Sequence, residues 1–179
     1  MKKIVLVNTS ENDSSQTKSF LLGLQEKLNL NYQVTYLSLS DLDRGLEDVL
    51  QADCLVLGLP IYYGSLSGKG KAFMEEFYDK NLRGKTLIPI FSSSKRGQAG
   101  IGLMVLLPWV FKEGLILKPP IDLDHGMTED DFEEALNQVS QALKDKHHEG
   151  LDIRFSDFTC LGKTYQVPMQ VTYKRKEEV

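Results

Sequence analysis

Short apolar runs alternate with longer segments of helical period along most of the chain, and this alternation restricts the fold more than any other feature. Five apolar runs and five helical segments follow one another before residue 150. Strands that alternate with helices favour a parallel sheet with crossover helices. The third run, Cys54–Leu59, is apolar throughout, as expected of a strand buried on both faces. We therefore predict one α/β domain over residues 1–149, with helices on both faces of its sheet.

The expected elements follow from this periodicity. Strands are predicted over residues 4–7, 34–37, 54–59, 86–91 and 115–117. Helices are predicted over residues 15–28, 43–51, 71–80 and 101–112, and a last helix runs from Thr128 to an end at Gly150. We expect Pro108 to kink or restart the fourth helix, Pro119–Pro120 to stop the fifth strand, and Thr128 with Asp131 to resemble a capping box.

Residues 150–179 form an addition to this pattern. Apolar and polar residues alternate from Thr164 to Tyr173, which predicts a strand with one apolar face. Leu161–Lys163 is typical of a hairpin turn whose first arm is Ile153–Cys160. Pro168 cannot donate to a ladder, so we expect an edge strand. The extension either lengthens the chain's own sheet or covers its core, or it is an arm that packs on a second subunit.

Composition excludes several classes of partner. The formal net charge is −4, and the basic stripe of nucleic-acid-binding proteins is absent. No segment approaches the ~18 uninterrupted apolar residues of a membrane helix. Met1–Val7 resembles a buried strand more than a signal peptide. Two cysteines cannot build a four-thiolate metal site, and Cys54 stands in an apolar run as a core residue. We expect a cytoplasmic protein with no metal, nucleic acid or membrane partner.

The loop after the first strand is the first candidate for a binding site, because ligands of parallel α/β sheets bind beyond the carboxyl ends of the strands. Asn8–Thr17 contains five hydroxyl side chains and leads into a helix. Hydroxyl donors, free amides and the dipole of a helix start suit a phosphate group. The loop also fits an ordinary helix start, with Asp13 as N-cap and Gln16 three residues later. For this loop alone, both interpretations stay open.

Two more loops follow the third and fourth predicted strands. Gly58–Gly68 contains the adjacent residues Tyr62 and Tyr63 and three glycines, and aromatic walls with close backbone amides suit a flat aromatic ligand. Ser92–Gly100 combines hydroxyl and amide donors with two cations, which suit the edge of a ring or the negative charge on a reduced ring. Each loop alone is also compatible with an ordinary turn. Because the fold brings all three loops to one crevice, together they predict a ligand site.

At these loops the sequence resembles the NAD(P)H-dependent flavin and quinone reductases of the flavodoxin-like superfamily. Ser10–Thr17 is similar to the phosphate loop of that family. The most specific likeness runs from Ala52-Asp53 through Pro60-Ile61-Tyr62-Tyr63-Gly64 to Lys71-Ala72-Phe73. The segments Leu82–Lys85 and Leu107–Gly114 also fit, and the likeness covers about residues 2–147.

The resemblance implies a flavodoxin-like three-layer sandwich, with a five-stranded parallel sheet of order 2-1-3-4-5. It also implies FMN as the cofactor, NADH or NADPH as the hydride donor, a quinone, flavin or other small acceptor, and a homodimer. No catalytic side chain is expected because the flavin carries the chemistry. His125, His147 and His148 are not expected to take part.

Carried over residue by residue, the resemblance assigns three groups of positions to FMN. Ser10, Ser15, Gln16 and Thr17 would hold the phosphate; Pro60, Ile61, Tyr62, Tyr63 and Gly64 would line the isoalloxazine ring; and Ser93, Lys95, Arg96 and Gly97 would flank its other edge.

The first loop departs from the family pattern, because Glu11 and Asn12 stand where that family often has a proline and a basic residue. Asp13 adds a second carboxylate. Phosphate binding therefore requires that Glu11 and Asp13 point to solvent, since a nearby carboxylate offsets the attraction of a helix start. A flavodoxin-type electron carrier, and a flavin-free interaction protein that keeps the fold, are the alternative functions.

Overall fold

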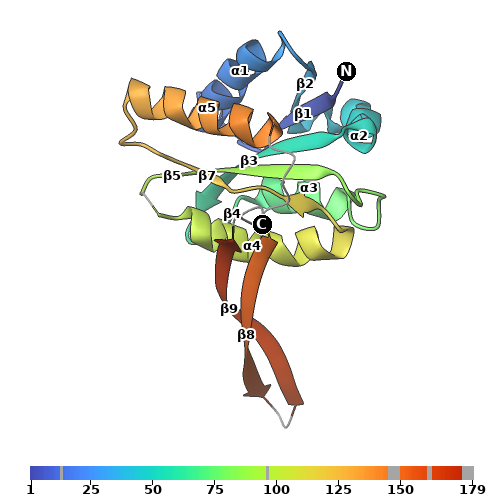
Figure 1. Cartoon of the computed structure of the whole chain (residues 1–179), viewed down its shortest axis with the longest axis vertical. Coiled ribbons are helices and arrows are strands. Elements are labelled where there is room, and N and C mark those ends of the chain that lie inside the picture. Colours follow the sequence, from blue (N-terminus) through green and yellow to red (C-terminus); the bar gives the residue numbers. More distant parts are fainter. Residues whose placement is uncertain (13, 96, 145–149, 161–162, 175–179) are drawn as a thin grey trace, which may run out of the picture. The chain divides into compact units, whose positions relative to one another are not determined.

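The computed structural model describes residues 1–12, 14–95, 97–144, 150–160 and 163–174. The chain divides into two compact units, Met1–Lys144 and Asp145–Val179. In the first unit, strands and helices alternate in the predicted manner (Figure 1).

The strands of the first unit are β1 (Lys3–Asn8), β2 (Gln33–Ser38), β3 (Cys54–Tyr62), β4 (Ser65–Leu66), β5 (Thr86–Ser93), β6 (Ile116–Leu117) and β7 (Ile121–Asp124). Its helices are α1 (Gln16–Leu28), α2 (Leu42–Gln51), α3 (Gly68–Glu76), α4 (Ala99–Glu113) and α5 (Glu129–Lys144), and a short 3-10 turn, Leu39–Asp41, precedes α2.

The sheet follows the predicted order. Its strands lie in the order β2-β1-β3-β5-β6, and all these pairs are parallel. Seven strands are present in place of the five expected, because β4 pairs antiparallel with β3 and β7 pairs with β5. The fold is therefore flavodoxin-like, with two additional short strands.

The fifth strand position is split in two. β6 pairs with Thr86–Leu87, and β7 pairs with Ile90–Ser93 farther along β5. Pro119 and Pro120 lie between them and have no amide hydrogen to donate to a ladder. The prediction that the strand stops at these prolines was thus incomplete, because it resumes at Ile121.

The core on one face of the sheet is formed with α1 and α5, whereas α3 and α4 lie on the opposite face (Figure 1). Ile4, Val56 and Ile88 of the sheet are fully buried in this core. The rings of Phe20 in α1 and Phe132 in α5 meet edge to face with centroids 5.2 Å apart. Burial of such alternating strand residues drives the sheet and the two helices together.

Two helix ends and one proline inside a helix test the predictions made from the sequence. Thr128 and Asp131 form a capping box, in which each side chain accepts the other residue's backbone N–H, at 3.2 and 2.9 Å. α4 continues through Pro108 without interruption, and both the proline and Met104 in the preceding turn are exposed. α5 ends at Lys144, and Gly150 belongs to a strand, so the prediction that Gly150 ends the helix was wrong.

The second unit is a hairpin of two long antiparallel strands, β8 (Gly150–Cys160) and β9 (Lys163–Lys174). They form a sheet of their own, in which Leu151 lies opposite Tyr173 and Cys160 opposite Lys163. The register shifts between Arg154 and Phe155. The predicted turn residues 161–162, and also His147 and His148, lie outside the described residues.

Within the part of the chain that the structure describes, no helix combines the length and apolar character needed to cross a membrane.

Candidate functional site

The loops that follow β1, β3, β5 and β7 meet at the carboxyl edge of the sheet around a cavity of about 300 Å³. Its walls are Ser10, Asn12, Ser14, Ser15, Gln16, Pro60, Ile61, Tyr62, Ser92, Ser93, Ser94 and His125. Six of these residues carry hydroxyls on serine side chains, and one carries an exposed aromatic ring. The three predicted loops therefore converge as the topology requires.

The first loop is held by its own side chains. The Asn8 Oδ1 atom accepts the amide of Ser10 at 3.0 Å, and the Asn12 Oδ1 atom accepts the amide of Ser14 at 3.0 Å. Ser15 is the N-cap of α1, because its hydroxyl accepts the amide of Lys18 at 3.2 Å. The prediction that Asp13 caps the helix was therefore wrong, since a serine two residues later satisfies the same kind of amide.

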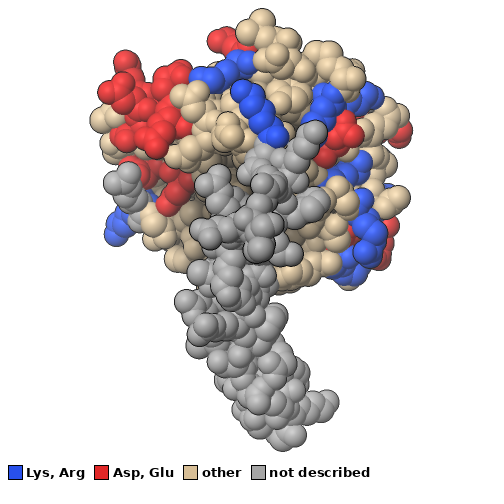
Figure 2. Space-filling view, viewed as in Figure 1, with Lys and Arg blue, Asp and Glu red and all other residues tan. Residues whose placement is uncertain are grey.

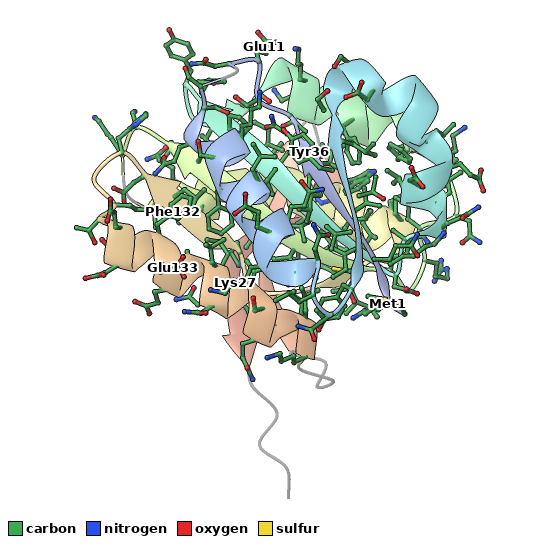
Figure 3. All side chains as sticks on the ribbon, turned by 90° about the horizontal axis from the view of Figure 1, so that it is seen from above. Met1, Glu11, Lys27, Tyr36, Phe132 and Glu133 are labelled. Atoms are coloured by element: carbon green, nitrogen blue, oxygen red, sulfur yellow. The ribbon has the colours of Figure 1, made fainter. Side chains whose placement is uncertain are left out.

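The Glu11 carboxylate lies away from the cavity. Its side chain is exposed and projects from the outer tip of the loop (Figure 3), and it takes no part in the cavity wall. Phosphate binding requires that the Glu11 side chain point to solvent, and it does. Asp13 lies outside the described residues.

Thr17 lies behind the cavity wall, where it connects two loops. Its side chain is fully buried, and its Oγ1 atom lies 2.6 Å from the Ser92 Oγ atom at the end of β5. Its methyl group fills the space above Gly58, since a Cβ atom built there would lie 2.4 Å from Thr17 Cγ2. Only glycine at position 58 leaves room for this threonine.

The Gln16 side chain presents an unpartnered acceptor at the cavity. Its Nε2 atom donates to the Asp124 carbonyl at 2.7 Å, which ties the start of α1 to the end of β7. Its Oε1 atom is buried and has no hydrogen-bond partner within the described chain. A buried acceptor without a partner is costly, so this oxygen suits a ligand that brings a hydroxyl or N–H donor.

The second loop divides into a cavity wall and a turn. Pro60, Ile61 and Tyr62 line the cavity, and Tyr62 is about half exposed. Tyr62 pairs with Ser65, so Tyr63 and Gly64 form a two-residue turn with φ values of 51° and 72°. These are the positive values of a type I′ turn, which cost a residue such as tyrosine about 1–2 kcal/mol. Tyr63 and Gly64 are not part of the wall, and Tyr63 is fully exposed.

The third loop contributes hydroxyl groups more than cations. Ser93 is buried in the wall and donates to the Lys95 carbonyl at 2.5 Å. The Gly97 amide, with φ of 84°, donates to the Asp122 Oδ2 atom at 2.8 Å. Lys95 and Gly97 are exposed and lie outside the wall, and Arg96 lies outside the described residues.

The sequence interpretation missed five wall residues, namely Asn12, Ser14, Ser92, Ser94 and His125. His125 was expected to take no part, but it lies in the wall because β7 delivers the loop that follows it to the same edge of the sheet. The four-residue strand β7 places it there, and this strand was not predicted from the sequence.

Charge is distributed unevenly around the first unit. Figure 2 shows acidic side chains gathered at the upper left, over the start of α5, whose first turn contains Glu129, Asp130 and Asp131. Carboxylates stabilise a helix N-terminus. An anionic ligand group would meet repulsion on this side, so the hydroxyl-rich loop after β1 is the more favourable place for it.

Cys54 is a core residue, as predicted. It is a fully buried free thiol in β3, and burial raises its pKa to about 12. A thiol that keeps its proton is not a nucleophile at neutral pH.

Comparisons with known proteins agree with this geometry. The family model described as NADPH-dependent FMN reductase matches residues 2–111. Among curated protein sequences, none matches the chain.

Solved structures share the fold at low sequence identity. NADH:FMN oxidoreductase (EMOB) in its apo form has a TM-score of 0.65 at 16% identity, covering 79% of this chain and 88% of that chain. An NADPH-quinone reductase from P. pentosaceus has a TM-score of 0.60 at 19% identity, covering 79% and 96%. A flavodoxin from the domain Archaea has a TM-score of 0.62 at 22% identity, covering 82% and 100%.

Proposed function

The chain belongs to the NADPH-dependent FMN reductase family, and on this premise we propose that it passes a hydride from NADH or NADPH, through bound FMN, to a quinone, flavin or other small acceptor. Membership makes it a flavin-dependent oxidoreductase. The donor and the acceptor are the proposed part. The observation that supports the proposal most is the convergence of three loops on one cavity whose hydroxyl-rich end and aromatic wall suit FMN, the group that would pass the hydride.

The cavity has groups that suit the parts of FMN. Ser10, Ser14 and Ser15 would hold the phosphate at the start of α1, where backbone amides and the helix dipole favour an anion. The unpartnered Gln16 Oε1 atom would accept from a ribityl hydroxyl. When bound, FMN would supply the hydride chemistry, and the protein's part is to bind, orient and exclude water.

The flat ring would lie between the second and third loops. Pro60, Ile61 and Tyr62 offer an apolar and aromatic surface on one side. On the other side Ser94 offers a hydroxyl donor, whereas the Ser93 hydroxyl, which donates to Lys95, offers an acceptor. Thr17 would act indirectly, because its bond to Ser92 fixes the distance between the phosphate end and the ring end of the site.

A titration with FMN tests the cofactor assignment. The purified full chain should show flavin absorbance or quench FMN fluorescence on addition, and it should then oxidise NADPH steadily in the presence of a quinone. FMN binding without NADPH turnover would identify a flavodoxin-type carrier. Failure to bind FMN would indicate the flavin-free alternative and refute the proposal.

A matched pair of serine variants tests whether the FMN phosphate binds at the start of α1. Ser14→Asp puts a carboxylate in the cavity wall and should weaken FMN binding at least about tenfold, through repulsion of one or more unit charges. Ser19→Asp makes the same change at an exposed position of α1 outside the wall and should change the affinity by less than about twofold. Equal effects of the two variants would place the phosphate elsewhere.

We also propose that the protein is a homodimer. α4 is apolar on both sides: Leu103 and Leu106 are buried, whereas Ile101, Met104 and Phe111 are exposed at intervals of three and seven residues. A helix that is apolar all round is normally covered. Sedimentation of the full chain should give a dimer, and Phe111→Glu should shift it toward the monomer.

A further inference from the structure

The apolar residues of β8 change faces halfway along the hairpin. Successive residues of a strand lie on alternate faces of its sheet. Leu151, Ile153 and Phe155 therefore share one face, whereas Phe158 and Cys160 lie on the opposite face. The apolar period of β8 thus slips by one residue between Phe155 and Phe158.

β9 makes the same change through an extra residue. Alternation along β9 alone would keep all its apolar residues on one face. The register skips Met169, however, because Gln170 lies opposite Arg154 and Pro168 lies opposite Phe155. A shift of one residue moves the residues beyond it to the other face. The opposite pairs of the far half of the hairpin, residues 156–160 and 163–167, are Ser156–Val167, Asp157–Gln166, Phe158–Tyr165, Thr159–Thr164 and Cys160–Lys163.

The hairpin therefore has two apolar faces that point in opposite directions. One is formed in the near half, residues 150–155 and 168–174, and the other in the far half. A two-stranded sheet is marginally stable alone in water and needs a surface to pack against. Since one surface can cover only one face, any body that covers the near half leaves the apolar face of the far half uncovered. The far half needs a second body.

The apolar face of the far half suits a copy of itself. Phe158 and Tyr165 form a bulky pair, and the pairs on either side of it each contain a small residue, Ser156 or Cys160. Alternation of large and small residues lets two identical faces interdigitate across a twofold axis. The apolar pairs of the near half contain no residue as small as serine or cysteine. The near half is thus less suited to pairing with itself.

The area exposed on α4 also requires a further contact with a second copy. Ile101, Met104 and Phe111 are 37%, 58% and 54% exposed, which together equals about one and a half large side chains, or roughly 300 Å². A stable interface buries about 800 Å² on each partner. α4 alone therefore provides less than half of a dimer interface. Phe158 and Tyr165 would add about 150–250 Å² each.

We propose that the apolar face of the far half packs against the same face of a second copy, so that the two hairpins form a four-stranded sandwich. Sheets that pack in this way lie about 10 Å apart. The inference rests on the proposed homodimer, to which it adds a second interface, and it does not depend on the cofactor or the co-substrates.

Two neighbouring residues give a matched pair of variants of the full chain. Phe158→Glu puts a carboxylate on the apolar face of the far half, and Thr159→Glu puts it on the other face. In sedimentation, Phe158→Glu should raise the dissociation constant of the dimer at least about tenfold, because a charge in an apolar interface loses its water. Thr159→Glu should stay within about twofold of the unchanged chain. Both variants should keep the Trp109 fluorescence of the folded first unit.

Cross-linking identifies the contact directly. Cys54 is fully buried and keeps its proton, so it should not react with a maleimide. In a Cys160→Ser background, Val167→Cys lies on the apolar face of the far half and Gln166→Cys on the opposite face. With a short bismaleimide, Val167→Cys should give a product of twice the chain mass, whereas Gln166→Cys should not.

The outcomes separate this inference from the other proposals. Equal effects of the two glutamate variants, or equal cross-linking at positions 166 and 167, would overturn the inference; if the chain still sediments as a dimer, the homodimer stands. A chain that is monomeric at all concentrations would overturn both. FMN titration of the same samples reports separately on the cofactor, because the hairpin takes no part in the cavity wall.

Discussion

Gly58→Ala is expected to damage both the core and the site, because this glycine lies against a side chain that cannot move. An added Cβ would lie 2.4 Å from Thr17 Cγ2 and 2.9 Å from Leu21 Cδ1. Leu21 can change rotamer, but Thr17 is β-branched, fully buried and held by Ser92 at 2.6 Å. The clash must therefore push α1 away from β3.

The magnitude follows from two opposing effects. Overpacking a well-packed core costs about 1–3 kcal/mol, and alanine recovers about 0.4–1 kcal/mol by restricting the unfolded chain. The free energy of unfolding should fall by roughly 1–2 kcal/mol, which lowers the Tm by about 2–8 °C for a chain of this size. Urea unfolding followed by the fluorescence of Trp109, the one tryptophan of the sequence, measures it.

A control and a rescue make this prediction specific. Gly68→Ala changes a glycine whose added Cβ meets nothing within 4 Å, and it should leave stability unchanged or slightly raised. Thr17→Ser in the Gly58→Ala background removes the clashing methyl group but keeps the hydroxyl that bonds Ser92, so it should recover most of the loss. The reasoning is refuted if Gly58→Ala is as stable as Gly68→Ala, or if Thr17→Ser adds a further loss.

Three more substitutions test separate features of the fold. Thr128→Ala removes the capping box with Asp131 and should lower the free energy of unfolding by about 1 kcal/mol in urea titrations; a change below 0.3 kcal/mol would contradict it. Burial raises the pKa of Cys54 from 9.0 to about 12, so between these two pH values only the unfolded thiol ionises. The stability that the neutral thiol contributes is fully present below about pH 9 and is lost as the pH rises toward 12, so the free energy of unfolding should fall by up to about 1.4 kcal/mol per pH unit more steeply than in Cys54→Ala. Equal slopes for the two chains would disprove this. Lys85→Met removes an ammonium that donates to two carbonyls at the end of α2 and should cost about 1 kcal/mol, measured in the same way.

Periodicity predicted the sheet and most helices because those elements bury residues at a fixed spacing. The apolar run that begins at Cys54 is the clearest case, since it lies at the centre of the sheet with neighbours on both sides. Its extension to Tyr62 was not predicted, because Pro60 signals an end in sequence. In the structure Pro60 still lies opposite Ser92 in the ladder.

The sequence predicted which loops form the site, but only some of the residues that line it. Topology alone brings the ends of parallel strands together, so the three loops could be named in advance. Which side chain of a loop faces the cavity depends on local hydrogen bonds, such as those that Asn8 and Asn12 accept, and these leave no periodic signal. The place of His125 depended on a four-residue strand after two prolines, too short to recognise by alternation.

The interruption at Pro119 and Pro120 also affects how this sheet meets other chains. An edge strand with a continuous row of free amides and carbonyls can recruit a foreign strand and seed aggregation. At the β6 and β7 edge, two consecutive residues lack the amide that such a partner would need. In the part of this sheet that the structure describes, β2 at the other side offers six consecutive residues along which a foreign strand could pair. Protection against misassembly is thus concentrated at the edge beside the candidate site.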